Sequence, residues 1–288
     1  MSAILEINNL CKQYKNSEFG LKNVSMTIPS GTIMGFVGEN GSGKTTTIGC
    51  ILNTLIKDSG SIKIFGKEMT DDATDIRDQI GVVYDSNPFP GHFTPAKIAR
   101  AMKYIYSRWD NGLFSEYLVK FKLPEKKTIH TFSRGMQMKL SVAVALSHHP
   151  RLLVFDEATS GLDPIVRDDV LDVFLDFVQD AGRSILMSSH ITSDLEKVAD
   201  YITFISDGEI IFTEQKDRLK YDYGLMRCTA AQFAQVDKAD VLAYRKRDYQ
   251  TDVLVANRSN AIQKYGDVVI DTVTIEEIML MFVKGEKL

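Results

Sequence analysis

The first residues of this chain that could do chemistry lie in a glycine-rich segment, GENGSGKT, at residues 38–45. A continuous apolar run at residues 33–37 precedes this segment, and a stretch of helical character follows it. In such a setting the glycines let backbone N–H groups turn towards a phosphate, at which the positive end of the helix dipole also points. A lysine at this position reaches the β- and γ-phosphates, and a threonine hydroxyl binds Mg²⁺. Lys44 and Thr45 are therefore predicted to hold a nucleoside triphosphate with its magnesium ion.

Two adjacent carboxylates, Asp156 and Glu157, end a second apolar run at residues 152–155. Open α/β sheets bind their ligands where the parallel strands end. Taken alone, such an acidic pair is most often a solvated turn. In a chain that also carries a phosphate-binding loop, Asp156 suits the shell of Mg²⁺, and Glu157 suits polarising an attacking water. The pair is predicted to supply one metal ligand and one catalytic residue.

Strand and helix patterns alternate around these residues. Beyond residue 133, helical patterns alternate with strand patterns at residues 138–147, 152–155, 165–179, 185–188, 193–199 and 202–211. This alternation predicts an α/β fold with a mainly parallel sheet covered by helices. Before it, alternating apolar and polar residues at 5–7 and 24–28 predict two further strands.

A helical stretch between about residues 94 and 124 interrupts this alternation. Thr94 suits the N-cap of a helix and Pro95 its first position. Four residues at helical spacing are expected to share a face buried in the core, namely Ile98, Met102, Ile105 and Trp109. We expect an inserted helical subdomain at about residues 93–140, within a first domain of residues 1–220.

The pattern changes again in residues 221–288. Short apolar patches lead to a final helix, which Thr274 and Glu277 begin with a capping-box pattern. Ile275, Ile278, Met279 and Phe282 share one face of that helix. These residues predict a small, separate α+β domain.

The composition is that of an ordinary globular protein, with 44% apolar and 25% charged residues. A net charge of −4 gives no sign of a nucleic-acid partner. Cys11, Cys50 and Cys228 are scattered, which favours a reducing compartment over a disulfide framework or a zinc site. Neither a signal peptide nor a run of about 20 apolar residues is found. If the protein acts at a membrane, we therefore expect it to bind another, membrane-spanning chain from the cytoplasmic side.

Three further segments extend the pattern in a fixed order. They are TFSRGMQMKL at residues 131–140, SGLD at residues 160–163 and SSH at residues 188–190. These segments resemble the signature segment, the D-loop and the switch histidine of ABC ATPases, and the first has the form of the signature common among drug and peptide exporters. A phosphate-binding loop alone occurs in many NTPases, whereas this set in this order, over about residues 4–208, is specific to ABC ATPases. The resemblance implies the P-loop NTPase fold of that family, with an antiparallel β subdomain beside the main sheet, and an ATPase that uses ATP and Mg²⁺.

The resemblance also implies a role for each matched position. Ser133 and the backbone of Gly135 bind the γ-phosphate held by a second ATP-binding subunit, so that two chains pair head-to-tail around two ATP molecules. His190 contacts the γ-phosphate and the water, although a histidine in this place could also be an ordinary core residue. Tyr14 lies where the family has an aromatic residue stacked on adenine, with ordinary packing as the alternative.

The complete set of expected site residues follows from these roles. The expected nucleotide-binding residues are Tyr14, Gly38, Glu39, Asn40, Gly41, Ser42, Gly43, Lys44, Thr45 and Thr46. The expected signature residues, which act on the partner's ATP, are Ser133, Arg134, Gly135, Met136 and Gln137. The expected catalytic residues are Glu157 and His190, and the expected metal ligands are Thr45, Asp156 and Asp85.

Two segments, the signature and the Q-loop, depart from the family pattern. In the signature, Phe132 stands where the family has leucine. Arg134 replaces the first glycine of the signature pair and adds a positive charge near the partner's phosphates. Asp85 stands where the family normally has the glutamine of the Q-loop. A shorter, anionic side chain could face Mg²⁺ directly or through water, and its reach towards a membrane subunit is then in question.

The sequence is compatible with two functions. In the first, the chain is the ATP-hydrolysing subunit of an exporter of a peptide, drug or antimicrobial, bound at the inner face of the cell membrane to a separate transmembrane permease. The SRGM signature and the ending TIEEIM resemble ATPases of antimicrobial-peptide and bacitracin exporters. In the second, it is a non-transport ABC ATPase that acts on nucleic acid or the ribosome. Because the chain has one nucleotide domain and no long coiled coil, the first function is favoured and no nucleic-acid partner is expected.

Overall fold

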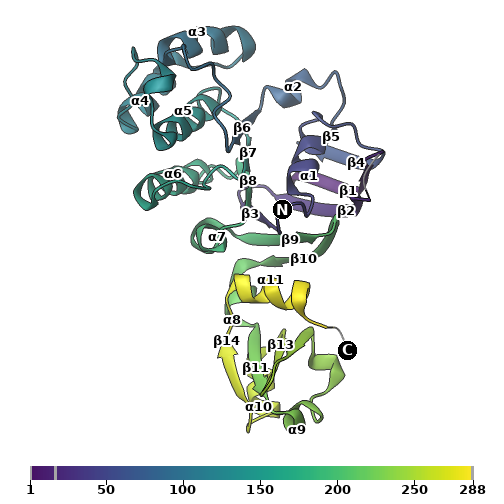
Figure 1. The fold of residues 1–288 in the computed structure, drawn as a ribbon. Helices are drawn as coiled ribbons and strands as arrows, with labels where there is room; N and C mark the ends of the chain where they lie inside the picture. The colour runs from purple at the N-terminus through teal and green to yellow at the C-terminus, as the bar shows by residue number, and fades with distance from the viewer. Residues whose placement is uncertain (1, 16–17, 287–288) are drawn as a thin grey trace.

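The computed structural model describes residues 2–15 and 18–286 and is built around a six-stranded sheet (Figure 1). The strand order is β10-β9-β3-β8-β7-β6. The strands are β3 (Ile33–Val37), β6 (Ile80–Tyr84), β7 (Leu152–Asp156), β8 (Ser184–Ser189), β9 (Tyr201–Ser206) and β10 (Glu209–Gln215). All neighbouring pairs are parallel except β9 with β10. Every residue of β3, β7 and β8 is buried, as expected for strands covered on both faces.

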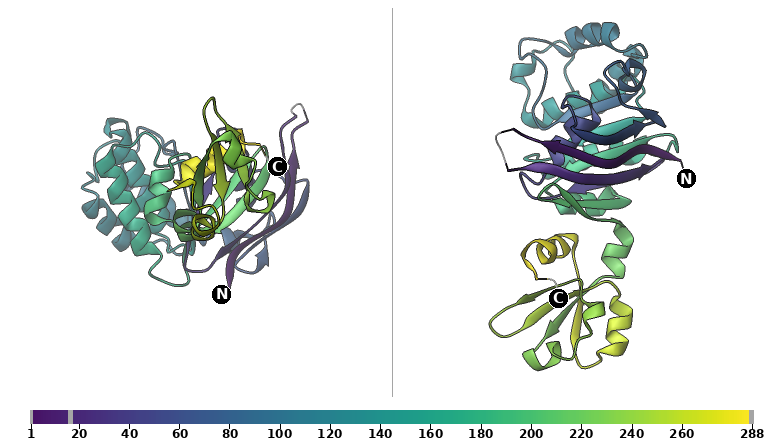
Figure 2. Two further views of the ribbon diagram at one scale, coloured as in Figure 1. Left: turned by 90° about the horizontal axis from the view of Figure 1, so that it is seen from below. Right: turned by 90° about the vertical axis from the view of Figure 1, so that its right-hand side faces the viewer.

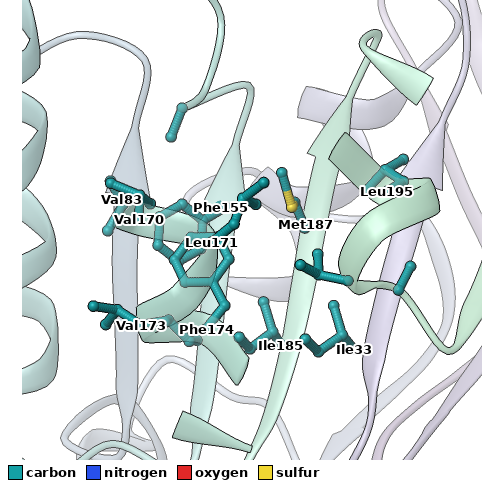
Figure 3. Packing of buried hydrophobic residues seen from close by; sticks show 14 of the residues in the cluster. Ile33, Val83, Phe155, Val170, Leu171, Val173, Phe174, Ile185, Met187 and Leu195 are labelled. Carbon is teal, nitrogen blue, oxygen red and sulfur yellow. The ribbon is translucent and has the colours of Figure 1, made fainter. Parts of the chain in front are cut away.

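Helices on one face of this sheet close the largest core. They are α5 (Arg134–Leu146), α6 (Pro164–Phe177) and α7 (Thr192–Val198). Figure 3 shows side chains from β6, β7, β8 and β3 meeting those of α6 and α7. The rings of Phe155 on β7 and Phe174 on α6 lie 4.2 Å apart between centroids. This packing fixes the strand ends from which the site residues project.

A second sheet lies beside the first, with the order β2-β1-β4-β5 and antiparallel pairing throughout. Its strands are β1 (Ala3–Gln13), β2 (Gly20–Pro29), β4 (Ser59–Ile64) and β5 (Lys67–Glu68), and a short helix, α2 (Thr74–Arg77), follows. The helix α1 (Lys44–Ile51) packs between the two sheets, because Ile48 and Ile51 share one buried cluster with residues of both. The predicted antiparallel β subdomain is thus present, with longer strands than the sequence indicated.

The helical subdomain contains α3 (Pro95–Ile105), α4 (Asn111–Lys120), the 3-10 turn η1 (Ile129–Thr131) and the start of α5. Thr94 caps α3 by accepting a hydrogen bond from the backbone N–H of Lys97, as predicted. The predicted buried face is correct for Ile98 and wrong for Ile105, which is 63% exposed. The reason is that α3 ends at Ile105, so the helical spacing does not continue to Trp109, which packs against the core from the following connection.

The last part of the chain forms a third sheet below the first, entirely antiparallel, with the order β12-β13-β11-β14 (Figures 1 and 2). Its strands are β11 (Gly224–Cys228), β12 (Ala243–Lys246), β13 (Thr251–Val255) and β14 (Val269–Thr272). Its helices are α8 (Lys216–Tyr221), α9 (Ala230–Phe233), the 3-10 turn η2 (Lys238–Asp240), α10 (Arg258–Lys264) and α11 (Ile275–Lys284). Both hydrogen bonds of the predicted capping box between Thr274 and Glu277 are present at the start of α11.

The helix α11 lies between this third sheet and the main sheet (Figure 2). The backbone N–H of Ile275 donates to Glu196 on α7 at 3.3 Å, and the ring of Phe282 lies 5.4 Å from that of Phe212 on β10. Apolar packing is therefore continuous across residue 220. The third sheet also has a buried cluster of its own, which includes Met226 and Val253. We propose on that basis that residues 221–288 form a separate domain.

Candidate nucleotide-binding and catalytic site

The predicted phosphate-binding, acidic and switch residues meet at one edge of the main sheet. The parallel register pairs Val37 on β3 with Ser189 on β8, and Asp156 on β7 with both Ser188 on β8 and Tyr84 on β6. Because the four strands end together, the segments that follow them lie side by side. These segments carry the glycine-rich loop, the acidic pair, His190 and Asp85.

The glycine-rich loop requires glycine for two physical reasons. Gly43 has a φ of +116°, a conformation that side-chain-bearing residues rarely adopt. A Cβ atom on Gly38 would lie 2.4 Å from both the carbonyl oxygen of Ile205 and the hydroxyl of Ser42. The loop can therefore hold its tight path only with glycine at these positions, and it leads directly into α1 at Lys44.

Lys44 lies buried inside the loop, with 4% of its side chain exposed. Its ammonium group donates to the carbonyl oxygens of Gly38 at 2.8 Å and Glu39 at 3.1 Å. A carboxylate oxygen of Glu157 lies 3.1 Å away. A buried cation with three oxygen partners is held in one place, at the N-terminus of α1 where an anion is also favoured.

Asp156 and Thr45 bring two hard oxygen donors together. The Thr45 hydroxyl donates to Oδ1 of Asp156 at 3.3 Å, and the Ser188 hydroxyl donates to the same oxygen at 2.8 Å. Burial raises the pKa of Asp156, and the hydrogen bonds from the two hydroxyls oppose that shift. Ser188 also accepts a hydrogen bond from the backbone N–H of Glu157 at 3.0 Å.

This donor set fits Mg²⁺ bound together with a triphosphate. Among residues 2–15 and 18–286, no group of three or more His, Cys, Asp or Glu side chains could hold a metal ion alone. Mg²⁺ usually takes only one or two carboxylates from a protein and completes its shell with phosphates and water. Thr45 and Asp156 offer the protein's share of such a shell.

Glu157 is held between a cation and a histidine. Its Oε2 lies 2.7 Å from Nδ1 of His190, and its Oε1 contacts Lys44. Burial would raise the pKa of Glu157, but Lys44 and His190 outweigh it and lower the pKa below its ordinary value. The carboxylate is therefore ionised near neutral pH and can accept hydrogen bonds from a water molecule. Its φ of +55° is rare for a residue with a side chain and typical of strained functional positions.

Tyr14 lies at the open side of the same loop. A cavity of about 520 Å³ is lined by Tyr14, Phe19, Asn40, Gly41, Gly43, Lys44, Thr45, Thr46 and Glu157. The Tyr14 hydroxyl lies 3.4 Å from that of Thr46. The ring of Phe19 lies 6.3 Å from that of Tyr14 with an interplanar angle of 27°. The sequence pattern predicted Tyr14 as the aromatic residue of this cavity and missed Phe19. The nearness of Phe19 to Tyr14, five positions along the chain, could have indicated it.

The signature segment is separate from this cavity. Of the residues that the structure describes, none from 133–137 lines it. Ser133 caps α5 by accepting from the backbone N–H of Met136 at 3.3 Å, and both Ser133 and Arg134 are exposed. Gly135 is buried against Val166 of α6, from which a Cβ atom would be 3.0 Å away, and Gln137 donates to the carbonyl of Phe132 at 3.2 Å.

Asp85 contacts Arg134 within the same chain. Its Oδ1 lies 2.5 Å from a guanidinium nitrogen of Arg134, and its backbone N–H donates to the carbonyl of Asp156 at 3.1 Å. The structure therefore brings the residue at the Q-loop position to the signature segment. The metal-ligand role given to Asp85 stays a prediction.

Comparisons with known proteins agree with this geometry. The sequence pattern of the family described as ABC transporter matches residues 21–160. The ABC transporter ATP-binding protein YtrB of Bacillus subtilis (strain 168) is 32% identical over 76% of this chain and 75% of its own length. The bacitracin transport ATP-binding protein BcrA of Bacillus licheniformis is 32% identical over 76% of this chain and 72% of its own length. The lantibiotic transport ATP-binding protein SrtF of Streptococcus pyogenes is 33% identical over 74% of this chain and 92% of its own length.

Solved structures share the fold at lower identity. The ATP-binding subunit of an ABC transporter superposes with a TM-score of 0.68 and 24% identity, covering 75% of this chain and 92% of that one. A dimeric ATP-binding cassette with ADP and inorganic phosphate superposes with a TM-score of 0.66 and 22% identity, covering 74% and 98%. No helix within the described ranges, 2–15 and 18–286, has the length and apolar character needed to cross a membrane. With the phosphate loop, the acidic pair and the switch histidine at one sheet edge, these relatives establish that the chain belongs to the ABC transporter family, as an ATP-binding and ATP-hydrolysing protein.

Proposed function

We propose that this chain supplies the energy for an exporter by pairing head-to-tail with a second ATP-binding subunit around two Mg²⁺-ATP molecules. The observation that carries the proposal is the separation of the signature segment from the nucleotide cavity of its own chain. Lys44, Thr45 and Glu157 are among the residues that line the cavity, and Ser133 is exposed outside it with its hydroxyl at the N-terminus of α5. A helix N-terminus with an exposed hydroxyl is a phosphate-binding element. A second subunit would bring that element to the γ-phosphate.

In this proposal each residue of the cavity has its own role in ATP hydrolysis. Lys44 would bind the β- and γ-phosphates, and Thr45 and Asp156 would hold Mg²⁺, which neutralises phosphate charge when bound. Glu157 would orient the water that attacks the γ-phosphorus, forming one P–O bond as the bond to ADP breaks. His190, 2.7 Å from Glu157, would hold that carboxylate and contact the γ-phosphate. Such catalysis rests on positioning and electrostatics.

The proposed cargo is a peptide, drug or antimicrobial carried by a separate transmembrane permease. Two relatives are named for bacitracin and lantibiotic transport, which supports a peptide antibiotic as the first cargo to test. The chain would then act at the inner face of the membrane, bound to the permease. An action on nucleic acid or ribosomes is not favoured, because these relatives are transport ATP-binding proteins.

Transport by purified components tests this function. The chain is purified from membranes together with the permease that accompanies it and is placed in vesicles with the ATP-binding side outward. Labelled bacitracin and a labelled lantibiotic are offered with ATP, and the Lys44→Ala variant is the matched control. ATP-dependent uptake by the wild type, absent from the control, supports the proposal. Active ATP hydrolysis without movement of any peptide or drug in the panel would contradict the exporter role.

A further inference from the structure

We propose that Asp85 and Arg134 form a latch that holds the signature segment back and opens when Arg134 moves to the nucleotide of the second subunit. This inference rests on the proposed head-to-tail pairing. In it, Arg134 binds the phosphate of the second subunit's nucleotide, and Asp85 is its resting partner rather than a metal ligand. The family pattern has glycine and glutamine at these two positions, so two of the residues that depart from that pattern contact each other.

The ion pair joins two parts of the chain that are 49 residues apart. Asp85 follows β6 and is fixed at its backbone by the hydrogen bond from its N–H to the carbonyl of Asp156. Arg134 is the first residue of α5, directly after the Ser133 cap. Their side chains meet at 2.5 Å between Nη2 and Oδ1. The pair therefore connects the acidic end of β7 with the signature helix.

A third loop adjoins the same guanidinium. Gly161, between β7 and α6, has a φ of +67°, and a Cβ atom on it would lie 2.9 Å from Nη1 and 3.0 Å from Cζ of Arg134. The guanidinium thus lies over a glycine and leaves no room for a side chain there. Arg134 contacts both the segment after β6 and the loop that precedes α6, so its departure would change the surroundings of both.

Exposure makes the latch easy to open. The side chains of Arg134 and Asp85 are 53% and 50% exposed. Ion pairs at such positions stabilise a folded chain little, because water screens them. A triphosphate carries more negative charge than one carboxylate, and guanidinium binds phosphate through two parallel hydrogen bonds. Once a second subunit presents its nucleotide, the phosphate should therefore outcompete Asp85 for Arg134.

The test measures how much ATP is needed to form the dimer. All variants carry Glu157→Gln to slow hydrolysis, and dimer formation is followed by light scattering after gel filtration over a range of ATP concentrations. Adding Asp85→Asn frees Arg134, so the half-saturating ATP concentration should fall about two- to fivefold, the range of an exposed ion pair. Adding Arg134→Ala should raise this concentration. Asp85→Asn should then have no further effect in the Arg134→Ala background.

A matched ion pair and a charge exchange complete the test. Lys120 on α4 and Asp176 on α6 form another exposed ion pair, at 3.1 Å, in which no signature residue takes part. Asp176→Asn should therefore leave the ATP requirement unchanged. Exchanging the charges, with Asp85→Arg and Arg134→Asp together, restores the ion pair but puts an anion in the signature. The exchanged chain should dimerise poorly if Arg134 serves the nucleotide.

The outcomes separate the latch from the proposed function. Failure of the Glu157→Gln chain itself to dimerise with ATP would contradict head-to-tail pairing. Dimerisation of that chain with no shift on Asp85→Asn would overturn the latch alone. Recovery of the original ATP requirement by the charge-exchanged chain would also overturn it, since the pair would then be only structural.

Discussion

The phosphate loop and the signature segment are both helix N-termini, yet they are built very differently. Lys44, at the start of α1, is 4% exposed and has three oxygen partners from its own chain. Ser133 and Arg134, at the start of α5, are exposed, and the Ser133 hydroxyl accepts a local hydrogen bond from the backbone N–H of Met136. The phosphate loop is thus organised in advance within one chain. The signature is equally well folded but presents its polar groups outward, as a surface for a partner does.

The largest effect should come from the carboxylate that completes the phosphate-loop side. Glu157→Gln keeps the shape of the side chain and removes the charge that we propose orients the attacking water. Turnover should fall about 10²- to 10⁴-fold, the usual contribution of such a group, while ATP still binds. Phosphate release and binding of a fluorescent ATP analogue measure the two quantities separately. Turnover within tenfold of the wild type would remove Glu157 from the catalytic role.

The signature side can be broken without unfolding its helix. Ser133→Asp keeps an N-cap residue of equal quality but points a carboxylate at the partner's γ-phosphate. Because like charges brought together in an interface cost several kcal/mol, turnover should fall about 10²-fold or more. ATP binding to the single chain should stay unchanged, which equilibrium titration checks. Ser133→Thr is the control that should keep both properties.

Replacing Lys44 should weaken the binding of ATP itself. Lys44→Ala removes a charge-assisted contact to phosphate and leaves Glu157 without its cation. ATP affinity should fall about 10- to 100-fold, the range for a hydrogen bond to a charged group. Calorimetric titration measures this, and equal affinity in the variant and the wild type would overturn the account of the phosphate loop. Lys44→Ala should thus impair ATP binding to the single chain, whereas Ser133→Asp should impair only the step in which the signature of a second chain completes the site.

The smallest effect should come from the aromatic side of the cavity. Tyr14→Ala and Phe19→Ala should each weaken ATP binding about fivefold or more if the replaced ring stacks on the base, since one such contact is worth about 1–3 kcal/mol. The triphosphate alone, offered as inorganic tripolyphosphate, should bind the wild type and both variants equally. A loss with Phe19→Ala only would assign the stacking to Phe19 and leave Tyr14 with ordinary packing.

The comparison also shows what a sequence can reveal. The phosphate loop, the acidic pair and the Thr274 capping box depend on neighbours a few residues apart, and all three were visible as short patterns. Ser188 lies in the SSH segment, but that segment gave no sign that the Ser188 hydroxyl bonds to Asp156, 32 residues away, and to the backbone of Glu157. The contact between Asp85 and Arg134 escaped prediction for the same reason. Ile105 was misplaced because the spacing gave no sign of where α3 ends.

The third sheet illustrates the same limit at the level of topology. Its short apolar patches were recognisable, as was the final helix with its buried Ile275 and Ile278. In the order β12-β13-β11-β14, β11 pairs with β13 and β14, neither of which is its neighbour in the chain. This order therefore depends on long-range contacts that propensity does not encode. The packing of α11 against α7 is another contact of this kind.

The central claim is that each site consists of one chain's phosphate loop and another chain's signature, and mixing two inactive chains tests it most directly. The Lys44→Ala chain keeps an intact signature, and the Ser133→Asp chain keeps an intact phosphate loop. When they are mixed at equal concentrations, dimers containing one of each possess one complete site. We predict ATP hydrolysis by the mixture well above that of either chain alone, with the wild type as positive control. Hydrolysis by the mixture equal to the sum of the two separate chains, while the wild type is active, would contradict the account.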